Sequence, residues 1–141
     1  MIRDVMLHVL RAEAAKAPIL DNSQVLIDYL FADLAHLPVE RLRVLFLNAK
    51  NRLLRDEVMS EGSVKETPIY PREIIRRALE LGATALILAH NHPSGDPTPS
   101  RGDIEGTRRL AAVASGLDII VHDHVVVARS GWSSFRSLGL I

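Results

Sequence analysis

Two histidines and one aspartate near the middle of the sequence are spaced so that they can hold a metal ion. His90 and His92 end the apolar run LILAHNH, and Asp103 follows after a loop. Alternate residues of a strand point to the same side, so the two imidazoles would face one way with Cα atoms about 6–7 Å apart. Three protein ligands and one open position are typical of a catalytic zinc site. These residues therefore predict a catalytic metal centre, and the intervening Asn91 is expected to face away from it.

The loop between the histidines and Asp103 supports this interpretation and also allows a second one. Pro93, Pro97 and Pro99 stiffen the loop, so little entropy is lost in holding a ligand geometry. Ser100 and Asp103 also have the spacing of a helix-capping box, which needs no metal. The two roles are compatible, because a cap that orients Ser100 also orients Asp103.

A second H-x-H pair, His122 and His124, lies in the run VHDHVVV. Spacing alone does not exclude it as the metal site, but it has no third ligand nearby and no rigid loop, and it lies within an apolar strand. We therefore expect His124 to be packed, or to contact a ligand rather than the ion. His8 and His36 lie on predicted helices and are expected to be solvated or packed.

Helices and strands alternate along the chain and must position these residues. Apolar residues three and four apart predict helices over 2–15, from about 21 to 37, 70–82 and 101–115. Strands are expected as a pair within 39–64 that turns near 48–51, at 84–89, at 118–128, and as a final strand or turn within 134–141. The continuous apolar run 84–89 is typical of a central strand that is buried on both faces. We expect a mixed α/β domain of about 4–6 strands over residues 21–141, preceded by a linker helix over 1–20.

Composition limits the classes of protein and of metal ligand. The 141 residues correspond to one domain, and the absence of cysteine excludes disulfides and thiolate ligands, so His, Asp and Glu must hold any metal. The 17 basic and 17 acidic residues cancel, whereas a nucleic-acid-binding protein would usually show a basic excess. No secretory signal and no bilayer-spanning apolar run is recognisable, so we expect a cytoplasmic protein without a membrane partner.

The run from His90 to Asp103, H-x-H-P-S-G-x-x-x-P-S-x-x-D, resembles the metalloprotease motif of the JAMM/MPN+ (JAB domain) family, in its bacterial RadC branch. The stretch YPREIIRRALELGATALILAHNHPSGDPTPS marks this branch most specifically. Shorter matches are VLFLN (44–48), DHVVV (123–127) and S-F-x-x-x-G (134–139). The resemblance covers residues from about 21 to the C-terminus. It implies an α/β (α+β) fold of the MPN/JAB type, which is cytidine-deaminase-like, with a mixed sheet flanked by helices.

The resemblance also implies a role for each site residue. Family members bind Zn²⁺ through the two histidines and the aspartate of the motif, here His90, His92 and Asp103. The catalytic glutamate of RadC-like chains lies a few residues before the V-L-F-L run, which points to Glu40. Glu57 and Glu61 are the rival candidates, and Glu40 is preferred for its position relative to the motif.

The chemistry implied by the resemblance is hydrolysis of a peptide or isopeptide bond. Zn²⁺ lowers the pKa of its bound water to about 7, so that hydroxide exists at cellular pH. Glu40 would accept the proton of that water and deliver it to the departing amine. The zinc and the hydroxyl of Ser100 would stabilise the oxyanion. The expected partner is a protein or peptide substrate, and the sequence does not indicate an oligomeric state.

Two alternatives to a hydrolase stay open. RadC-like chains often carry an upstream helix-hairpin-helix module that binds the DNA backbone, and the printed sequence has no counterpart of it. A DNA-associated repair or recombination accessory protein would predict salt-sensitive DNA binding. A non-catalytic MPN scaffold is the other alternative, and the complete ligand set argues against it, because inactive relatives typically lose a ligand.

Overall fold

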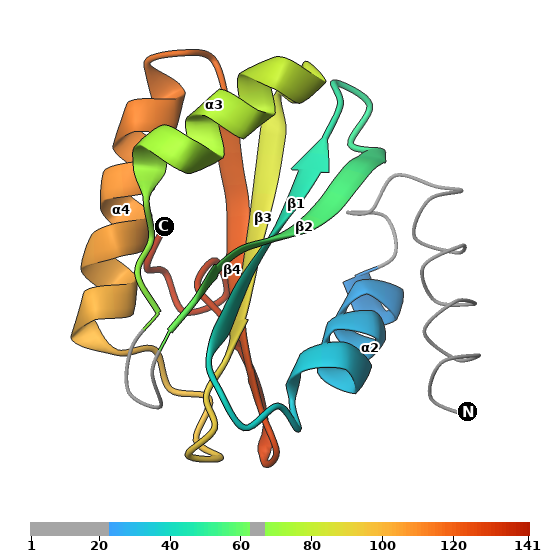
Figure 1. The fold of residues 1–141 in the computed structure, drawn as a ribbon, viewed down its shortest axis with the longest axis vertical. Helices are drawn as coiled ribbons and strands as arrows, with labels where there is room; N and C mark the ends of the chain where they lie inside the picture. The colour runs from blue at the N-terminus through green and yellow to red at the C-terminus, as the bar shows by residue number, and fades with distance from the viewer. Residues whose placement is uncertain (1–22, 63–66) are drawn as a thin grey trace.

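The computed structural model describes residues 23–62 and 67–141 and shows a mixed five-stranded sheet with helices on both faces (Figure 1). The described helices are α2 (Ser23–Leu34), α3 (Pro71–Leu81) and α4 (Arg101–Ser115). The strands are β1 (Arg41–Leu47), β2 (Leu53–Glu61), β3 (Ala85–Asn91), β4 (Ile120–Ala128) and β5 (Gly131–Ser134). The mixed α/β fold predicted from the sequence is confirmed. The predicted linker helix over 1–20 lies outside the described residues.

The sheet has the strand order β2-β1-β3-β4-β5, in which β3 and β4 are parallel and the other neighbours are antiparallel. Helix α2 covers one face, and α3 and α4 cover the other (Figure 1). A parallel pair needs a crossover connection, and α4 supplies it between β3 and β4. The chain from the last residues of β3 to the first turn of α4, which carries the predicted metal ligands, therefore lies at the carboxyl end of the central strand.

Strand β3 is buried along its whole length, as its continuous apolar sequence predicts. Ala85, Ile87 and Ala89 belong to the core on the α2 face. Leu86 and Leu88 belong to the core on the α3 and α4 face. Because side chains alternate along a strand, the next residue of the second set, His90, faces the α4 side, and Asn91 faces the α2 side.

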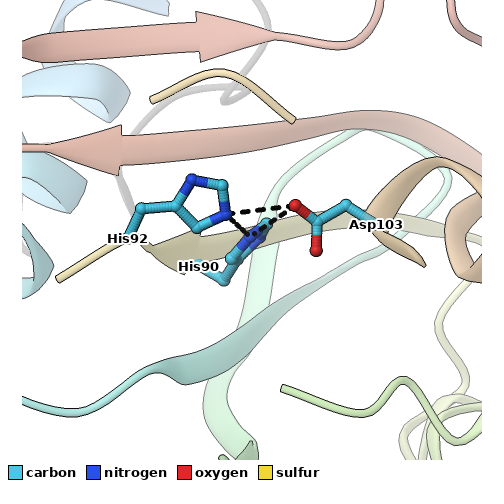
Figure 2. A group of neighbouring side chains, drawn as sticks. All are labelled: His90, His92 and Asp103. Atoms are coloured by element: carbon cyan, nitrogen blue, oxygen red, sulfur yellow. Dashed lines mark hydrogen bonds and ion pairs between the residues drawn. The ribbon is translucent and has the colours of Figure 1, made fainter. Parts of the chain in front are cut away.

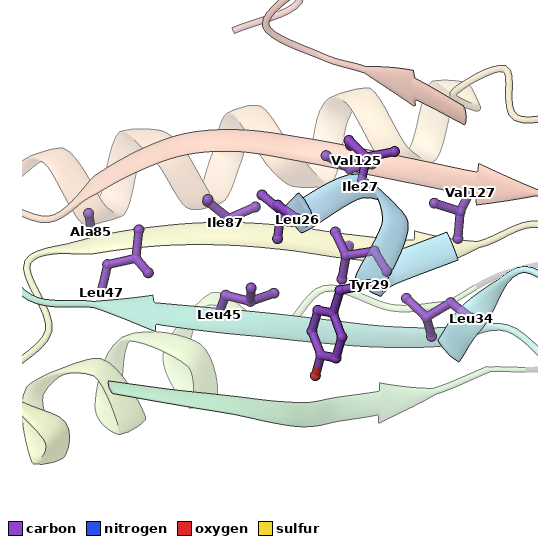
Figure 3. Close-up of a cluster of buried hydrophobic side chains, with 12 residues drawn as sticks. Leu26, Ile27, Tyr29, Leu34, Leu45, Leu47, Ala85, Ile87, Val125 and Val127 are labelled. Carbon is purple, nitrogen blue, oxygen red and sulfur yellow. The ribbon is translucent and has the colours of Figure 1, made fainter. Parts of the chain in front are cut away.

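The core beneath α2 fixes this helix on the sheet (Figure 3). Leu26 and Leu30 of the helix pack in one cluster with residues of β1, β3 and β4, namely Leu45, Leu47, Ile87, Val125 and Val127. The chain leaves α2 at this face and enters β1 at Arg41. The segment that carries Glu40 is thus anchored at both ends, by the helix before it and by the strand after it.

Both helices on the opposite face begin and end where the sequence predicts. Pro71 is the first residue of α3, and Gly82 ends the helix with φ of 70°, a left-handed conformation that glycine adopts without strain. Ser100 caps α4. No helix within the described ranges is long and apolar enough to cross a membrane.

The last strand differs from the sequence-based expectation. The final strand or turn was expected within 134–141, whereas strand β5 covers Gly131–Ser134 and the chain from 135 to 139 forms a turn. Ala128 pairs with Gly131, so only Arg129 and Ser130 connect β4 to β5. The sequence GWSS has no apolar alternation, and its strand conformation depends on pairing with β4 rather than on its own propensity.

We predict that Leu86→Ala lowers the free energy of unfolding by about 2–5 kcal/mol, because it opens a cavity in the α3 and α4 core. The matched control is Leu79→Ala on α3, whose side chain is 58% exposed, and its expected cost is at most about 0.5 kcal/mol. Urea unfolding of the two variants gives the comparison. Equal losses would contradict the placement of these two leucines.

Candidate metal centre

His90, His92 and Asp103 meet at the carboxyl end of β3 and point toward one another (Figure 2). The Nε2 atoms of His90 and His92 are 2.9 Å apart. Asp103 Oδ2 lies 3.1 Å from His92 Nε2 and 3.2 Å from His90 Nε2. The side chain of His90 is 2% exposed, and those of His92 and Asp103 are each 11% exposed. The structure thus brings the three predicted ligands together at a largely buried site, at which His92 and Asp103 keep a small exposed fraction.

The geometry and chemistry of the three donor atoms fit a divalent metal ion. Tetrahedral zinc with bonds of about 2.0–2.1 Å places its ligand atoms about 3.3 Å apart. The separations of 2.9, 3.1 and 3.2 Å are close to that value. Among the residues that the structure describes, this is the one group of histidines and carboxylates with such geometry.

The three side chains favour positive charge between them. Burial by itself would raise the pKa of Asp103, but hydrogen bonds from His90 and His92 outweigh it and hold this pKa well below its usual range. Burial by itself would lower the pKa of His92, but the hydrogen bonds to the Asp103 carboxylate and the Asp96 carbonyl outweigh it and raise this pKa. A carboxylate that stays ionised and imidazoles that attract a cation are what a metal centre requires.

The cap of α4 orients the Asp103 carboxylate. Ser100 Oγ accepts a hydrogen bond of 3.0 Å from Asp103 N–H, and Ser100 N–H donates to Asp103 Oδ2 at 2.8 Å. This is the reciprocal capping box that the sequence predicts. Capping and ligand placement therefore coexist, because the same Oδ2 faces the histidines. The Ser100 side chain is exposed and its oxygen is used as an acceptor, so its catalytic role stays a prediction.

The loop after β3 orients His92. Its Nδ1 lies 2.9 Å from the Asp96 carbonyl oxygen, which can only accept, so Nδ1 carries the proton and Nε2 faces the site. The β4–β5 hairpin fastens this loop from outside. Ser130 Oγ donates to the Gly95 carbonyl at 2.5 Å, and Ser133 Oγ donates to the Pro97 carbonyl at 2.6 Å. These two serines were not identified from the sequence, since their only signal is a short polar run far from the motif.

Glu40 lies beside the candidate metal centre, at the residue that precedes β1. Its Oε1 is 4.0 Å from His92 Nε2, and its Oε2 accepts a hydrogen bond of 2.7 Å from Thr67 Oγ1. The carboxylate is buried, with 5% of the residue exposed. Thr67 was not identified from the sequence, because it lies outside the motif and only the fold brings it to Glu40.

The two rival glutamates have partners elsewhere. Glu57 receives hydrogen bonds of 2.6–3.0 Å from Arg77, which hold its pKa below the usual value. Glu61 pairs with Arg41 at 2.6–2.8 Å. Glu57 ties β2 to α3, and Glu61 ties the end of β2 to β1. Glu40 is thus the one of the three candidate glutamates that lies beside the group of His90, His92 and Asp103.

Asn91 holds the Glu40 segment against β3. Its Oδ1 accepts from Arg41 N–H at 2.8 Å. Its Nδ2 donates to the carbonyls of Val39 at 2.9 Å and Leu37 at 3.4 Å. As expected, Asn91 faces away from the ligands, and it uses that direction to place the residues on both sides of Glu40.

The second histidine pair does not form a ligand set. His124 is fully buried, and its Nε2 lies 2.6 Å from Nδ1 of His90 rather than at the metal position. Burial and the neighbouring His90 hold the pKa of His124 well below its ordinary value. His122 bonds to Asn51 through Nε2 at 2.9 Å. The register between β3 and β4 shifts between the partners of Leu86 and Ile87, which leaves His122 unmatched in the ladder.

The remaining two histidines take no part in the site described. His36 packs its ring edge-on to Phe31, with ring centroids 6.1 Å apart. His8 lies outside the described residues.

We predict that Asn91→Ala lowers the free energy of unfolding by about 1–3 kcal/mol, because it leaves partly buried backbone groups without partners beside a fully buried side-chain position. Asn48→Ala is the matched control. The Asn48 side chain also bonds to the backbone, because its Oδ1 accepts from the N–H groups of Lys50 and Arg52, but it does so at the exposed β1–β2 turn, where water replaces the lost bonds. Chemical unfolding measures both losses, and a larger loss for Asn48→Ala would contradict the role of Asn91.

Comparison with known proteins identifies the family. A family model described as a RadC-like JAB domain matches residues 20–140. A UPF0758 protein from Rhodobacter capsulatus is 48% identical over 131 residues, which make up 93% of this chain and 61% of that protein. The chain therefore spans less than two thirds of the length of this relative. The match over 20–140, together with the ligand geometry at the end of β3, shows that the chain belongs to the RadC-like JAB domain family.

Proposed function

We propose that this protein is a zinc-dependent hydrolase of peptide or isopeptide bonds, with Glu40 as general base. The observation that carries the proposal is the position of a buried carboxylate beside three converging metal ligands. Glu40 Oε1 lies 4.0 Å from His92 Nε2, on the side of the ligand group that β1 approaches. Metal ligands with a neighbouring free carboxylate are the arrangement that metal-assisted hydrolysis uses.

The ligands and the zinc supply the first part of this chemistry. His90, His92 and Asp103 would hold the ion, and zinc bound there lowers the pKa of water and polarises a carbonyl group. Because His92 and Asp103 are partly exposed, the carbonyl group of a substrate could reach the site from solvent.

Glu40 supplies the proton transfer. The hydrogen bond from Thr67 occupies Oε2, so Oε1 is the oxygen that accepts the proton of the attacking water. The same oxygen then returns this proton to the departing amine. Thr67 holds the carboxylate and Asn91 holds the backbone that flanks Glu40, which limits the reorganisation needed during the reaction. Ser100 Oγ accepts from the helix and keeps its own hydrogen to donate to the developing oxyanion.

We predict that the purified protein holds about one zinc per chain, because three protein ligands and an open position make one site. His92→Ala removes one of the three ligands and is expected to abolish zinc retention after dialysis. His122→Ala is the matched control, since His122 bonds to Asn51 and not to the ligand group. Elemental analysis by mass spectrometry gives the ratio. Equal zinc in the two variants would contradict this ligand assignment.

We predict that Glu40→Gln keeps the zinc but slows hydrolysis by about 10²–10⁴-fold, the usual contribution of a general base. The amide is close in shape to the carboxylate, so the fold and ligands are preserved. Glu61→Gln is the control, because it also removes one carboxylate, from an exposed ion pair. The rate is measured by mass spectrometry as the cleavage of a library that contains linear peptides and isopeptide-linked peptides. Full activity of Glu40→Gln would sink the assignment of the base.

A further inference from the structure

A chain of buried hydrogen bonds lies behind His90, on the side away from the ligand group. His90 Nδ1 is 2.6 Å from His124 Nε2, and His124 Nδ1 is 2.7 Å from Thr107 Oγ1. Thr107 Oγ1 in turn lies 2.6 Å from the backbone carbonyl of Asp103. His124 and Thr107 are fully buried. These hydrogen bonds thus link His90 on β3, through the side chains of His124 and Thr107, to the backbone of Asp103 on α4.

The Asp103 carbonyl, at the end of this series, determines which atom is the donor in each hydrogen bond. The Asp103 carbonyl cannot donate, so the Thr107 hydroxyl gives its single hydrogen to that oxygen. Thr107 Oγ1 is then an acceptor toward His124, whose Nδ1 must carry the hydrogen of the 2.7 Å contact.

The same reasoning extends from His124 to His90. The ring of His124 stacks on Phe135, with centroids 4.5 Å apart and planes inclined by 20°, and a charged imidazole buried there would be costly. A neutral ring has one hydrogen, which Nδ1 already uses, so Nε2 of His124 is an acceptor. His90 therefore donates from Nδ1 across the 2.6 Å contact. This holds whether or not His90 Nε2 also carries a proton.

We propose that Thr107 and His124 are positioning residues that fix the hydrogen of His90 on Nδ1 and so reserve its Nε2 for the metal. His92 reaches the same tautomer through the Asp96 carbonyl, which is an obligate acceptor. The loop can offer His92 a backbone oxygen, whereas His90 is enclosed in the sheet and receives a side-chain acceptor from β4 instead. Only the step that concerns the metal rests on the proposed function, because the tautomer exists without it.

This assignment gives a role to sequence features outside the ligand motif. His124 and Phe135 belong to the runs DHVVV and S-F-x-x-x-G, which match the family but supply no ligand. Phe135 N–H donates to the His124 carbonyl at 3.0 Å, so the residue that stacks on the imidazole is also tied to its backbone. The C-terminal segment thus encloses the acceptor that orients His90.

The first test reads the tautomers directly in the metal-free, full-length chain. Long-range ¹H–¹⁵N spectra of histidine side chains distinguish a protonated from a bare ring nitrogen. We expect a hydrogen on Nδ1 of both His90 and His124, and a bare Nε2 on His124. A bare Nδ1 on His90, or a hydrogen on Nε2 of His124, would overturn the proposal. This result does not depend on zinc binding or on hydrolysis, so it separates the fate of this proposal from that of the proposed function.

The second test measures the affinity for zinc by competition with a chelating dye. Thr107→Val keeps the shape but removes the acceptor, so His124 is free to carry its hydrogen on Nε2 and to force the hydrogen of His90 onto its own Nε2. We expect zinc to bind about 10–100-fold more weakly, as is usual when the partner of a ligand is lost. Thr107→Ser keeps the hydroxyl and should restore parental affinity.

Leu110→Ala is the control for a merely structural effect, because Leu110 is a buried residue of the same helix α4 that lies outside the hydrogen-bond chain. It should lower the unfolding midpoint and leave the zinc affinity of the folded protein unchanged. Parental zinc affinity in Thr107→Val would overturn the proposal, and so would equal losses in the Val and Ser variants. If Thr107→Val does not fold, the tautomers of the parent chain still decide.

Discussion

Three atoms with free electron pairs meet at the carboxyl end of the central strand, and the surrounding elements of the fold hold them there. Two imidazole nitrogens and a carboxylate oxygen lie 2.9–3.2 Å from one another, where little water can screen them. Such a group is stable only with positive charge between its members, supplied by protons or by a metal ion. The low pKa of Asp103 and the raised pKa of His92 are two expressions of this one constraint.

Each donor atom is held by a different kind of structure. Asp103 is held by the capping box of α4, His92 by a carbonyl of a loop that the β4–β5 hairpin fastens, and His90 by a buried side chain of β4. The parallel pairing of β3 and β4 makes this possible, because it places the carboxyl end of β4 and the β4–β5 hairpin beside the carboxyl end of β3, where the loop and the first turn of α4 follow.

The two faces of β3 have different roles at the carboxyl end of this strand. His90 faces α4 and meets the other ligands, whereas Asn91 faces the opposite side and binds the backbone that flanks Glu40. Consecutive residues of one buried strand thus position the proposed metal ligand and the proposed base. A shift of β3 by one residue would exchange these two directions, so the register between β1 and β3 matters for both groups.

The local pattern of residues was sufficient to predict much of this protein. Apolar periodicity, Pro71, Gly82 and the capping residues give α3, α4 and the buried strand β3, because these signals act over a few neighbouring residues. The spacing of His90, His92 and Asp103 likewise predicted one metal-binding group, since strand alternation and a short loop bring these residues together.

Other features depend on contacts between distant segments, which no local pattern contains. The choice of Glu40 over Glu57 and Glu61 rested on a resemblance, and the geometry that separates them comes from ion pairs to other elements. Strand β5 exists only through its pairing with β4. His122 and His124 have the same spacing as His90 and His92, yet an irregularity in the β3–β4 ladder separates them, and His124 contacts a ligand from behind. Residue type and spacing indicate which side chains could form a site, and the packing of distant segments determines which of them come together.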